Sequence, residues 1–374
     1  MKKTFLYFCL LFIVQTAFAA DSLYVREQQI PILIDRIDNV LYEMRIPAQK
    51  GDVLNEITIQ IGDNVNLSDI QAIRLFYSGV EAPSRKGEHF SPVTYISSHI
   101  PGNTRKALES YSVRQDEVTA PLSRTVKLTS KQPMLKGINY FWVSIQMKPE
   151  TSLLAKVATT IPNAQINNKP IDITWKGKVD ERHVGIGVRQ AGDDGSAAFR
   201  IPGLVTTNNG TLLGVYDIRY NSSVDLQEKI DIGVSRSTDK GQTWEPMRVA
   251  MTFKQTDGLP HGQNGVGDPS ILVDEKTNTI WVVAAWTHGM GNERAWWNSM
   301  PGMTPDETAQ LMLVKSEDDG KTWSEPINIT SQVKDPSWYF LLQGPGRGIT
   351  MQPVCPTPAL CIAKTAGKHG TCIT

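Results

Sequence analysis

The chain has 374 residues, and its 38 lysines and arginines are balanced by 38 aspartates and glutamates, so its formal net charge is zero. No basic block interrupts this balance, and a nucleic acid or an anionic membrane surface is therefore not expected as a partner. A chain of this length can bury a large core, and the length predicts two domains.

The first residues have the three parts of a secretory signal peptide. Lys2 and Lys3 form a basic start, Phe5 to Val14 form an apolar stretch, and Ala17 to Ala19 form a small-x-small cleavage site. A membrane anchor would need about 20 apolar residues, and this stretch is shorter. We therefore expect residues 1–19 to be a signal peptide. The protein is expected to be exported, periplasmic or extracellular, with no later segment inserted in the membrane.

Cysteine is almost absent from the exported region. Cys9 lies in the leader, and the other three cysteines, Cys355, Cys361 and Cys372, fall at the end of the chain. The region between them must fold by core burial, because disulfides serve mainly small exported domains. The cysteine spacings do not match zinc pairs, and no histidine lies in an H-E-x-x-H pattern. We expect no metal and no cofactor.

Residues 20–180 show the alternation of half-buried strands. In Glu56 to Ile61, sequence EITIQI, the isoleucines share one face, and in Phe141 to Met147 every odd position is apolar. Helical periodicity is scarce, and its best candidate, Ser22 to Met44, would equally suit strands. We predict an all-β protein with an N-terminal β-sandwich, which is either a scaffold or a carbohydrate-binding accessory domain.

From residue 181 to 351 glycine and tryptophan become frequent, and two segments repeat. Ser237 to Trp244 reads STDKGQTW and Ser316 to Trp323 reads SEDDGKTW, so both fit the S-x-D-x-G-x-T-W pattern called an Asp-box. The aspartate can bond backbone N–H groups, the glycine accepts a positive φ, and the tryptophan can pack over the turn. Repeated four-stranded units with such turns predict the blades of a β-propeller.

The Asp-box positions are expected to be structural, because a turn that recurs from blade to blade does not mark a single site. They are Ser237, Asp239, Gly241, Trp244, Ser316, Asp318, Gly320 and Trp323.

Candidate chemistry precedes the first Asp-box. Arg200 stands between apolar neighbours in Phe199 to Gly203, sequence FRIPG, at the start of a strand. If it is buried, its guanidinium must meet an acidic side chain or an anionic ligand, because an unpaired buried charge is very costly. Asp225 follows on a polar loop, where it is either a turn former or, if burial favours its protonated form, a general acid.

Two later segments also place polar residues next to predicted strands or tight loops, where they could contact a ligand. Gly265 to Ser270, sequence GVGDPS, places Asp268 before an apolar run, and Gln343 to Ile349, sequence QGPGRGI, has glycines that allow close backbone approach. Exposed tryptophans near Arg294 would suit sugar faces, although several tryptophans in a β-rich domain are more often core. These tryptophans are Trp286, Trp296 and Trp297.

The FRIP segment, an aspartate about twenty-five residues later and the Asp-boxes together resemble the bacterial exo-α-sialidases (neuraminidases), over roughly residues 183 to 351. The preceding sandwich resembles the N-terminal domain of Bacteroides-type members. The resemblance implies a six-bladed β-propeller and retaining hydrolysis of terminal α-ketosidically linked sialic acids from glycoproteins, glycolipids and oligosaccharides.

The resemblance also implies roles for individual residues. Arg200 is implied to be one of three arginines that bind the sialic acid carboxylate, which suits arginine's planar fork. Asp225 is implied to be the catalytic general acid/base. Arg219 and Asp268 are implied to contact the sugar ring.

The family's nucleophile is a tyrosine activated by a glutamate, an exception among retaining glycosidases. The resemblance implies that this pair and the other two arginines come from later blades, and Tyr220, Tyr339 and Arg347 do not match them. The propeller is therefore expected to be incomplete, with open strand edges. We expect this chain to hydrolyse a fluorogenic sialoside far more slowly than an intact relative.

The last residues, 352–374, are expected to be out of frame. One allowed codon set for Cys361 to Gly370 is TGT ATA GCA AAG ACC GCG GGA AAA CAT GGA. Read one base earlier, with an A from the Leu360 codon, it encodes MYSKDRGKTW, in which SKDRGKTW is a third Asp-box. A frameshift near residue 352 would account for this, and a shifted frame in the gene without an open continuation would rule it out.

Two other functions fit part of the pattern. A sialoglycan-binding, lectin-like protein would hold the sugar without cleaving it, and glycan-array binding that is lost on replacing Arg200 would favour it. A non-enzymatic Asp-box propeller would be a protein-interaction scaffold, but a scaffold needs neither Arg200 nor Asp225. We therefore predict an exo-α-sialidase whose partners are sialylated glycans.

Overall fold

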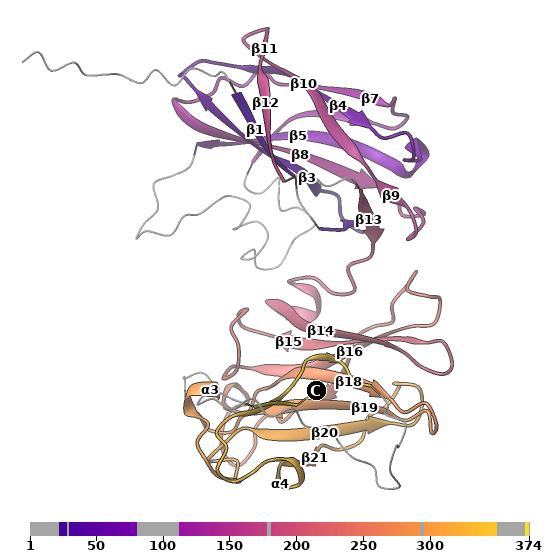
Figure 1. Cartoon of the computed structure of the whole chain (residues 1–374), viewed down its shortest axis with the longest axis vertical. Coiled ribbons are helices and arrows are strands. Elements are labelled where there is room, and N and C mark those ends of the chain that lie inside the picture. Colours follow the sequence, from indigo (N-terminus) through magenta and orange to yellow (C-terminus); the bar gives the residue numbers. More distant parts are fainter. Residues whose placement is uncertain are drawn as a thin grey trace, which may run out of the picture. The chain divides into compact units, whose positions relative to one another are not determined.

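The structure is a computed structural model, and it is almost entirely built of strands, which confirms the predicted all-β fold class (Figure 1). It describes residues 22–27, 30–80, 112–177, 181–291, 295–349 and 371–373. The predicted leader and almost all of the predicted out-of-frame tail lie outside these residues. In the described parts, no helix is long and apolar enough to cross a membrane.

The N-terminal unit is a sandwich of two sheets, with strand orders β12-β1-β3-β8-β5-β6 and β11-β10-β4-β7. The strands are β1 (Ser22–Glu27), β3 (Asn39–Ala48), β4 (Leu54–Ile61), β5 (Ile70–Val80), β6 (Val113–Thr119), β7 (Thr125–Thr129), β8 (Gly137–Met147), β10 (Thr159–Ile166), β11 (Lys169–Pro170) and β12 (Asp172–Lys176). A small third sheet has the order β2-β13-β9 and consists of β2 (Ile32–Leu33), β9 (Lys156–Val157) and β13 (Arg182–Gly185). The turn η1 (Leu67–Asp69) precedes β5.

One hydrophobic core lies between the two large sheets. The isoleucines of β4 at positions 57, 59 and 61 are fully buried in it, as are alternate apolar residues of β8. The predicted half-buried alternation is therefore confirmed for β4, whereas β8 is buried on both faces, because Tyr140, Trp142 and Ser144 are buried as well. Residues 22–44 form β1, β2 and the start of β3, so the helix considered for this segment is wrong and the strand alternative holds.

Strand β13 extends the first unit to Gly185. It pairs with β2 in parallel and with β9 in antiparallel register. The chain therefore divides between Gly185 and Ile186, a few residues after the boundary predicted at residue 180.

The second unit contains two successive four-stranded antiparallel meanders. The first consists of β14 (Ala198–Thr206), β15 (Leu212–Arg219), β16 (Ile230–Ser237) and β17 (Arg248–Met251), and the second of β18 (Val266–Val273), β19 (Ile280–Trp286), β20 (Gln310–Ser316) and β21 (Ile327–Asn328). These are the strand numbers and connections of propeller blades. The number of six blades stays a prediction.

Short elements complete this unit. Strand β23 (Gly346–Arg347) joins the second blade in parallel beside β18, and β22 (Leu341–Gln343) pairs with β24 (Thr371–Ile373). The turns η3 (Asp193–Gly195) and η4 (His261–Gln263) and the short helices α3 (Ala295–Asn298) and α4 (Thr330–Val333) lie in the connections.

The two blades share one core. Val215 and Val234 of the first blade pack in the same cluster as Ile271, Val282 and Val314 of the second, and all five are fully buried. Facing apolar surfaces of the two sheets thus hold the blades together, because burial of apolar area makes the main favourable contribution to the free energy of packing.

The two Asp-boxes form nearly identical turns. In the first, Ser237 Oγ donates to Asp239 Oδ1 at 2.8 Å, and the backbone N–H of Thr243 donates to the same oxygen at 2.9 Å. The equivalent distances from Ser316 and Thr322 to Asp318 Oδ1 are 2.8 and 2.9 Å. These bonds give hydrogen-bond partners to backbone N–H groups that the turn would otherwise leave unpaired.

The glycine of the second box has a special position. Gly320 has φ 78°, and a Cβ atom there would lie 2.9 Å from Leu213 Cδ2 of the first blade. Gly210 has φ 81°, but a Cβ atom there would meet nothing within 4 Å. Replacing each glycine by alanine therefore distinguishes the effect of backbone strain, which both positions share, from the effect of steric overlap, which only Gly320 has.

We predict that Gly320→Ala lowers the free energy of unfolding by about 1–3 kcal/mol more than Gly210→Ala does, because only the first adds overlap between blades to the shared positive-φ strain. Urea denaturation of both variants measures the difference. Equal losses would show that Leu213 does not confine Gly320.

Candidate active site

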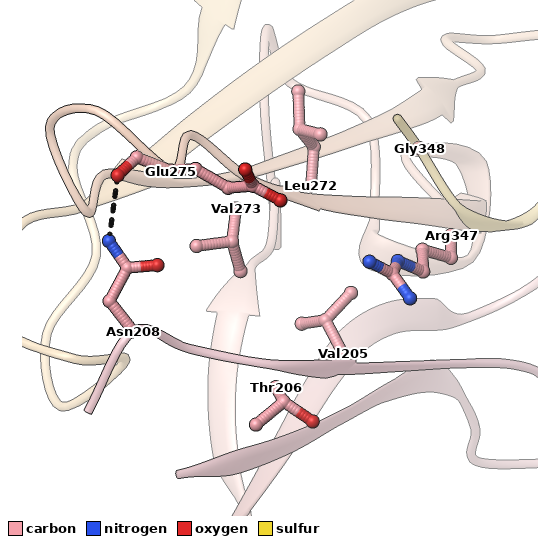
Figure 2. Close-up of a pocket in the computed structure, with 8 residues that line it drawn as sticks. All are labelled: Val205, Thr206, Asn208, Leu272, Val273, Glu275, Arg347 and Gly348. Atoms are coloured by element: carbon pink, nitrogen blue, oxygen red, sulfur yellow. Dashed lines mark hydrogen bonds between the residues drawn. The ribbon is translucent and has the colours of Figure 1, made fainter. Parts of the chain in front are cut away.

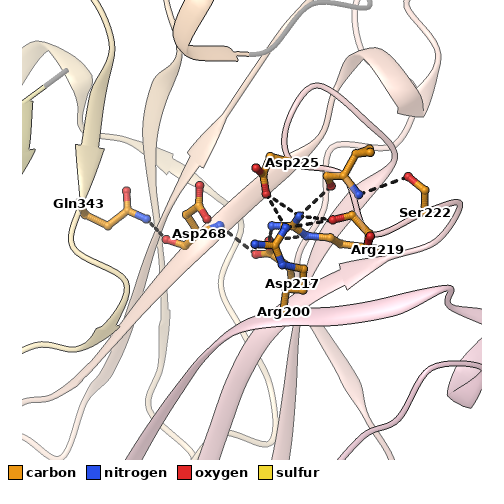
Figure 3. A network of polar contacts seen from close by, with 9 residues as sticks. Arg200, Asp217, Arg219, Ser222, Asp225, Asp268 and Gln343 are labelled. Atoms are coloured by element: carbon orange, nitrogen blue, oxygen red, sulfur yellow. Dashed lines mark hydrogen bonds and ion pairs between the residues drawn. The ribbon is translucent and has the colours of Figure 1, made fainter. Parts of the chain in front are cut away.

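Four residues singled out from the sequence meet at one end of the first blade, next to β18 (Figure 3). Arg200 is in β14, Arg219 is the last residue of β15, Asp225 is on the loop before β16, and Asp268 is in β18. Hydrogen bonds and ion pairs connect them, as described below.

A bulge in the first strand of each blade shapes this site. The register between β14 and β15 shifts after Arg200, and the register between β18 and β19 shifts after Gly267. In each bulge the residue that precedes a proline has a positive φ, 55° at Ile201 and 58° at Asp268. Such values are uncommon for residues other than glycine, and bulges re-aim side chains beside active sites. The two blades therefore repeat one backbone distortion here.

Arg219 uses all three guanidinium nitrogens. Its Nε and Nη2 donate to Asp217 Oδ2 at 3.0 and 2.7 Å. Its Nη1 donates to Asp225 Oδ1 at 2.7 Å and to the carbonyl oxygens of Ser223 and Val224 at 2.9 and 2.8 Å. The side chains of Arg219 and Asp217 are each only 1% exposed. Such a buried pair persists because its geometry and added hydrogen bonds offset desolvation.

Arg200 reaches the same aspartate from the solvent side. Its Nη1 donates to Asp225 Oδ1 at 2.7 Å and to the Ser223 carbonyl oxygen at 3.0 Å. The Arg200 side chain is 41% exposed and that of Asp225 is 37% exposed. Among the described residues, Nε and Nη2 of Arg200 donate no hydrogen bond. The sequence left open whether Arg200 is buried; its side chain is exposed, and its partner is an acidic side chain.

The backbone of Asp268 is held from both sides. Its N–H donates to Asp217 Oδ1 at 2.8 Å, and its carbonyl oxygen accepts a hydrogen bond from Gln343 Nε2 (Figure 3). The Asp268 side chain is half-buried. Burial raises the pKa of the Asp268 carboxyl, Arg219 and Arg200 oppose this rise, and the charge of Asp225 adds to it.

Burial also raises the pKa of Asp217, to about 7, although Arg219 favours the ionised form. For Arg219, burial would lower the pKa, but Asp217 and Asp225 outweigh it and raise the pKa, so Arg219 stays charged. The site thus contains two arginines and three aspartates within one network. Two of these carboxyls bind protons more tightly than an exposed aspartate does.

The sequence predictions missed Asp217, and they named Gln343 only as the first residue of a glycine-rich segment. Asp217 is two residues before Arg219 in a strand, so the period-two rule puts both side chains on one face and could have found it. Gln343 belongs to a glycine-containing loop far along the chain, and no local pattern connects it with Asp268.

Other candidate residues lie elsewhere. Trp286 is 6% exposed and stacks on Phe253, with ring centroids 4.3 Å apart, so it is core and does not offer a sugar-binding face. Trp297 is 60% exposed. Arg294 and the side chain of Trp296 lie outside the described residues.

Arg347 belongs to a different, separate cavity of about 210 Å³ between the ends of β14 and β18 (Figure 2). The residues that line it are Val205, Thr206, Asn208, Leu272, Val273, Glu275, Arg347 and Gly348. Within the described parts of the chain, no group of three histidine, cysteine, aspartate or glutamate residues could hold a metal ion.

Comparisons with known proteins agree with this architecture. Residues 20–170 match the family described as the N-terminal domain of BNR-repeat neuraminidase, and residues 201–358 match the BNR repeat-like domain. The chain is 60% identical to a sialidase of Bacteroides fragilis over 357 residues, which cover 94% of this chain and 65% of that protein. The chain belongs to the sialidase family.

Two further proteins that are similar to this sialidase-family chain are also named sialidases. The structure of the Hadza microbial sialidase Hz136 is 62% identical, with a TM-score of 0.76, and the match covers 88% of this chain and 64% of that one. A sialidase of Micromonospora viridifaciens is 30% identical over 53% of this chain and 29% of its own length. The chain thus spans somewhat less than two thirds of the Bacteroides sialidase and of Hz136.

We predict a pH-dependent effect of Asp217→Asn. Between pH about 4 and 7 the folded state keeps a proton on Asp217 that the unfolded chain has lost, because the folded pKa is about 7. The free energy of unfolding of the wild type should therefore fall by a few kcal/mol, relative to the variant, as pH rises through this window. Urea denaturation at several pH values measures it.

Asp194→Asn is the matched control for the loss of one carboxyl, since the Asp194 side chain is 42% exposed and pairs with Arg189. A wild type that instead gains stability over Asp217→Asn with rising pH would mean that pairing with Arg219 outweighs burial.

Proposed function

We propose that the protein is an exo-α-sialidase that removes terminal α-linked sialic acids from glycoproteins, glycolipids and oligosaccharides with retention of configuration. The chain spans 65% of the Bacteroides fragilis sialidase, so the proposal concerns the whole enzyme to which these residues correspond. The observation that carries it is the half-exposed Arg200 guanidinium beside Asp225, in a chain of the sialidase family.

Arg200 would bind the carboxylate of sialic acid. Its Nε and Nη2 donate no hydrogen bond among the described residues, and these two nitrogens form the flat edge that binds a carboxylate through two parallel hydrogen bonds. The fixed contact from Nη1 to the Ser223 carbonyl oxygen orients this edge before the ligand arrives. An oriented donor loses little freedom on binding, which favours affinity.

Asp225 would be the general acid/base. It lies on a loop that the Arg219 guanidinium ties down through the carbonyl oxygens of Ser223 and Val224, so the carboxyl is positioned by a buried group. Its side chain remains 37% exposed and can reach a ligand on Arg200. Asp268 would contact the sugar ring, whereas Arg219, whose side chain is 1% exposed, would act by holding the loop of Asp225 in place.

We assign the nucleophile to residues other than those described. Tyr220 donates its hydroxyl proton to Asp231 Oδ2 at 3.0 Å. Burial, followed by the charge of Asp231, raises the pKa of Tyr220, which keeps it a phenol. It is therefore unsuited to attack the anomeric carbon, and this agrees with a tyrosine and glutamate from later blades.

The remaining assignments follow from the sequence. We propose that residues 1–19 direct export to the periplasm or beyond, that the N-terminal sandwich is an accessory domain, and that residues 352–374 result from a shifted reading frame. Sialylated glycans would be the partners of the exported protein.

The substrate class is tested by carboxylate recognition. We predict that this chain binds N-acetylneuraminic acid at least about tenfold more tightly than its C1 methyl ester, and that Arg200→Gln removes this preference, because a hydrogen-bonded ion pair contributes roughly 1.5–3 kcal/mol. Ligand-observed NMR titration measures both affinities.

Arg248→Gln, which alters a partly buried arginine paired with Glu245, is the matched control and should keep the preference. Equal affinities for acid and ester in the wild type would refute the proposed substrate class.

A further inference from the structure

The contact between Asp225 and Arg200 conflicts with the role of a general acid. A general acid must hold a proton when the reaction starts. A guanidinium at 2.7 Å favours the ionised carboxylate instead, because an opposite charge this close stabilises the charged form. Something must weaken this pairing before Asp225 can give a proton to the leaving group.

Only one of the two arginines at Asp225 can change partner easily. Arg219 is 1% exposed, and its Nε and Nη2 both donate to Asp217 Oδ2, so it is fixed in the interior. Arg200 is 41% exposed and contacts Asp225 through Nη1. An anionic ligand from solvent can therefore form an ion pair with Arg200.

We propose that binding of the substrate carboxylate to Arg200 drives proton uptake by Asp225, so that the bound substrate converts Asp225 into the protonated form that a general acid needs. The inference rests on the proposed function and deepens it. One carboxylate of the ligand takes over the charge of Arg200, and one proton from solvent binds Asp225. When the glycosidic C–O bond breaks, this proton passes to the leaving oxygen, and Asp225 becomes a carboxylate that can then accept a proton from water.

The charges that face Asp225 support this exchange. Among the described residues they include Arg200 from β14, Arg219 from β15 and Asp268 from β18, and Asp217 of β15 lies behind Arg219. The two arginines already face the carboxyl groups of three aspartates, and the ligand adds a fourth carboxyl group. Mutual repulsion of carboxylates that share a site is relieved by protonation of one of them. Asp225 is the one that loses an arginine partner, because Arg200 turns to the ligand and only Arg219 stays bonded to it.

The exchange would also make the site selective. A neutral sugar that entered the site would leave Asp225 paired with Arg200, and the carboxyl would stay ionised. An acidic sugar would complete the charge exchange and protonate the acid. Recognition of the carboxylate and activation of the acid would thus be one event.

The test is isothermal titration calorimetry of this chain with the 2,3-unsaturated analogue of N-acetylneuraminic acid, in buffers of different ionisation enthalpy. The inference predicts net proton uptake per bound ligand between pH 5 and 7. In Asp225→Asn this uptake should be lost while binding persists. Any uptake that remains in the variant would belong to Asp217 or Asp268. Arg248→Gln should keep the wild-type uptake.

The outcomes separate the inference from the proposed function. Binding without proton uptake, or with the same uptake in Asp225→Asn, would overturn the inference and leave the function standing. Absence of ligand binding at every pH would count against the proposed function.

A measurement without ligand tests the inference in either case. The carboxyl carbon of Asp225 is titrated by ¹³C NMR in the wild type, in Arg200→Gln and in Arg248→Gln. Loss of the neighbouring charge should move the midpoint of Asp225 upward by about one pH unit or more in Arg200→Gln alone. An unchanged midpoint would mean that Arg200 does not hold the acid ionised, and the inference would be wrong.

Discussion

A guanidinium that is 1% exposed must meet carboxylates or carbonyl groups on every side, and Arg219 meets them on two elements of the chain. Asp217, on the same strand, takes Nε and Nη2, while the loop after the strand supplies Asp225 and two carbonyl oxygens to Nη1. The second oxygen of Asp217 accepts the backbone N–H of Asp268 in the next blade. The position of the loop that carries Asp225 and the contact between the two blades at the site therefore both depend on the pair of Arg219 and Asp217.

The burial that makes the pair rigid also sets the chemistry of its neighbours. A backbone without a side chain approaches Asp217 at Gly267, where a Cβ atom would lie 3.4 Å from both carboxylate oxygens. Water is displaced from Asp217, and the pKa of its carboxyl rises to about 7. Below about pH 7 the Asp217 carboxyl therefore holds a proton, and Asp225 and Asp268 are the carboxyls beside which an incoming carboxylate would add negative charge.

Much of this architecture could be predicted from the sequence. The alternation in β4 is a direct consequence of strand geometry, and the Asp-box turns depend on residues within eight positions of one another. The fold class and the meeting of Arg200, Arg219, Asp225 and Asp268 were therefore within reach of local patterns and a family resemblance.

The remaining features depend on contacts between distant segments. No local pattern shows that β18 passes beside Asp217, that Gln343 bonds the carbonyl oxygen of Asp268, or that residues 22–44 find strand partners in both directions along the chain. The bulge at Asp268 likewise becomes visible only when β18 is paired with β19. The sequence left open whether Arg200 is buried, and in the structure, where a bulge follows it, its side chain is 41% exposed.

The central claim is that the free edge of Arg200 is a carboxylate-binding group beside the acid Asp225. A crystal structure of this chain with the 2,3-unsaturated analogue of N-acetylneuraminic acid tests it most directly. The account predicts the ligand carboxylate on Nε and Nη2 of Arg200, at about 2.7–2.9 Å, with the sugar ring facing Asp225. A ligand whose carboxylate lies on other groups, with the edge of Arg200 unoccupied, would contradict it.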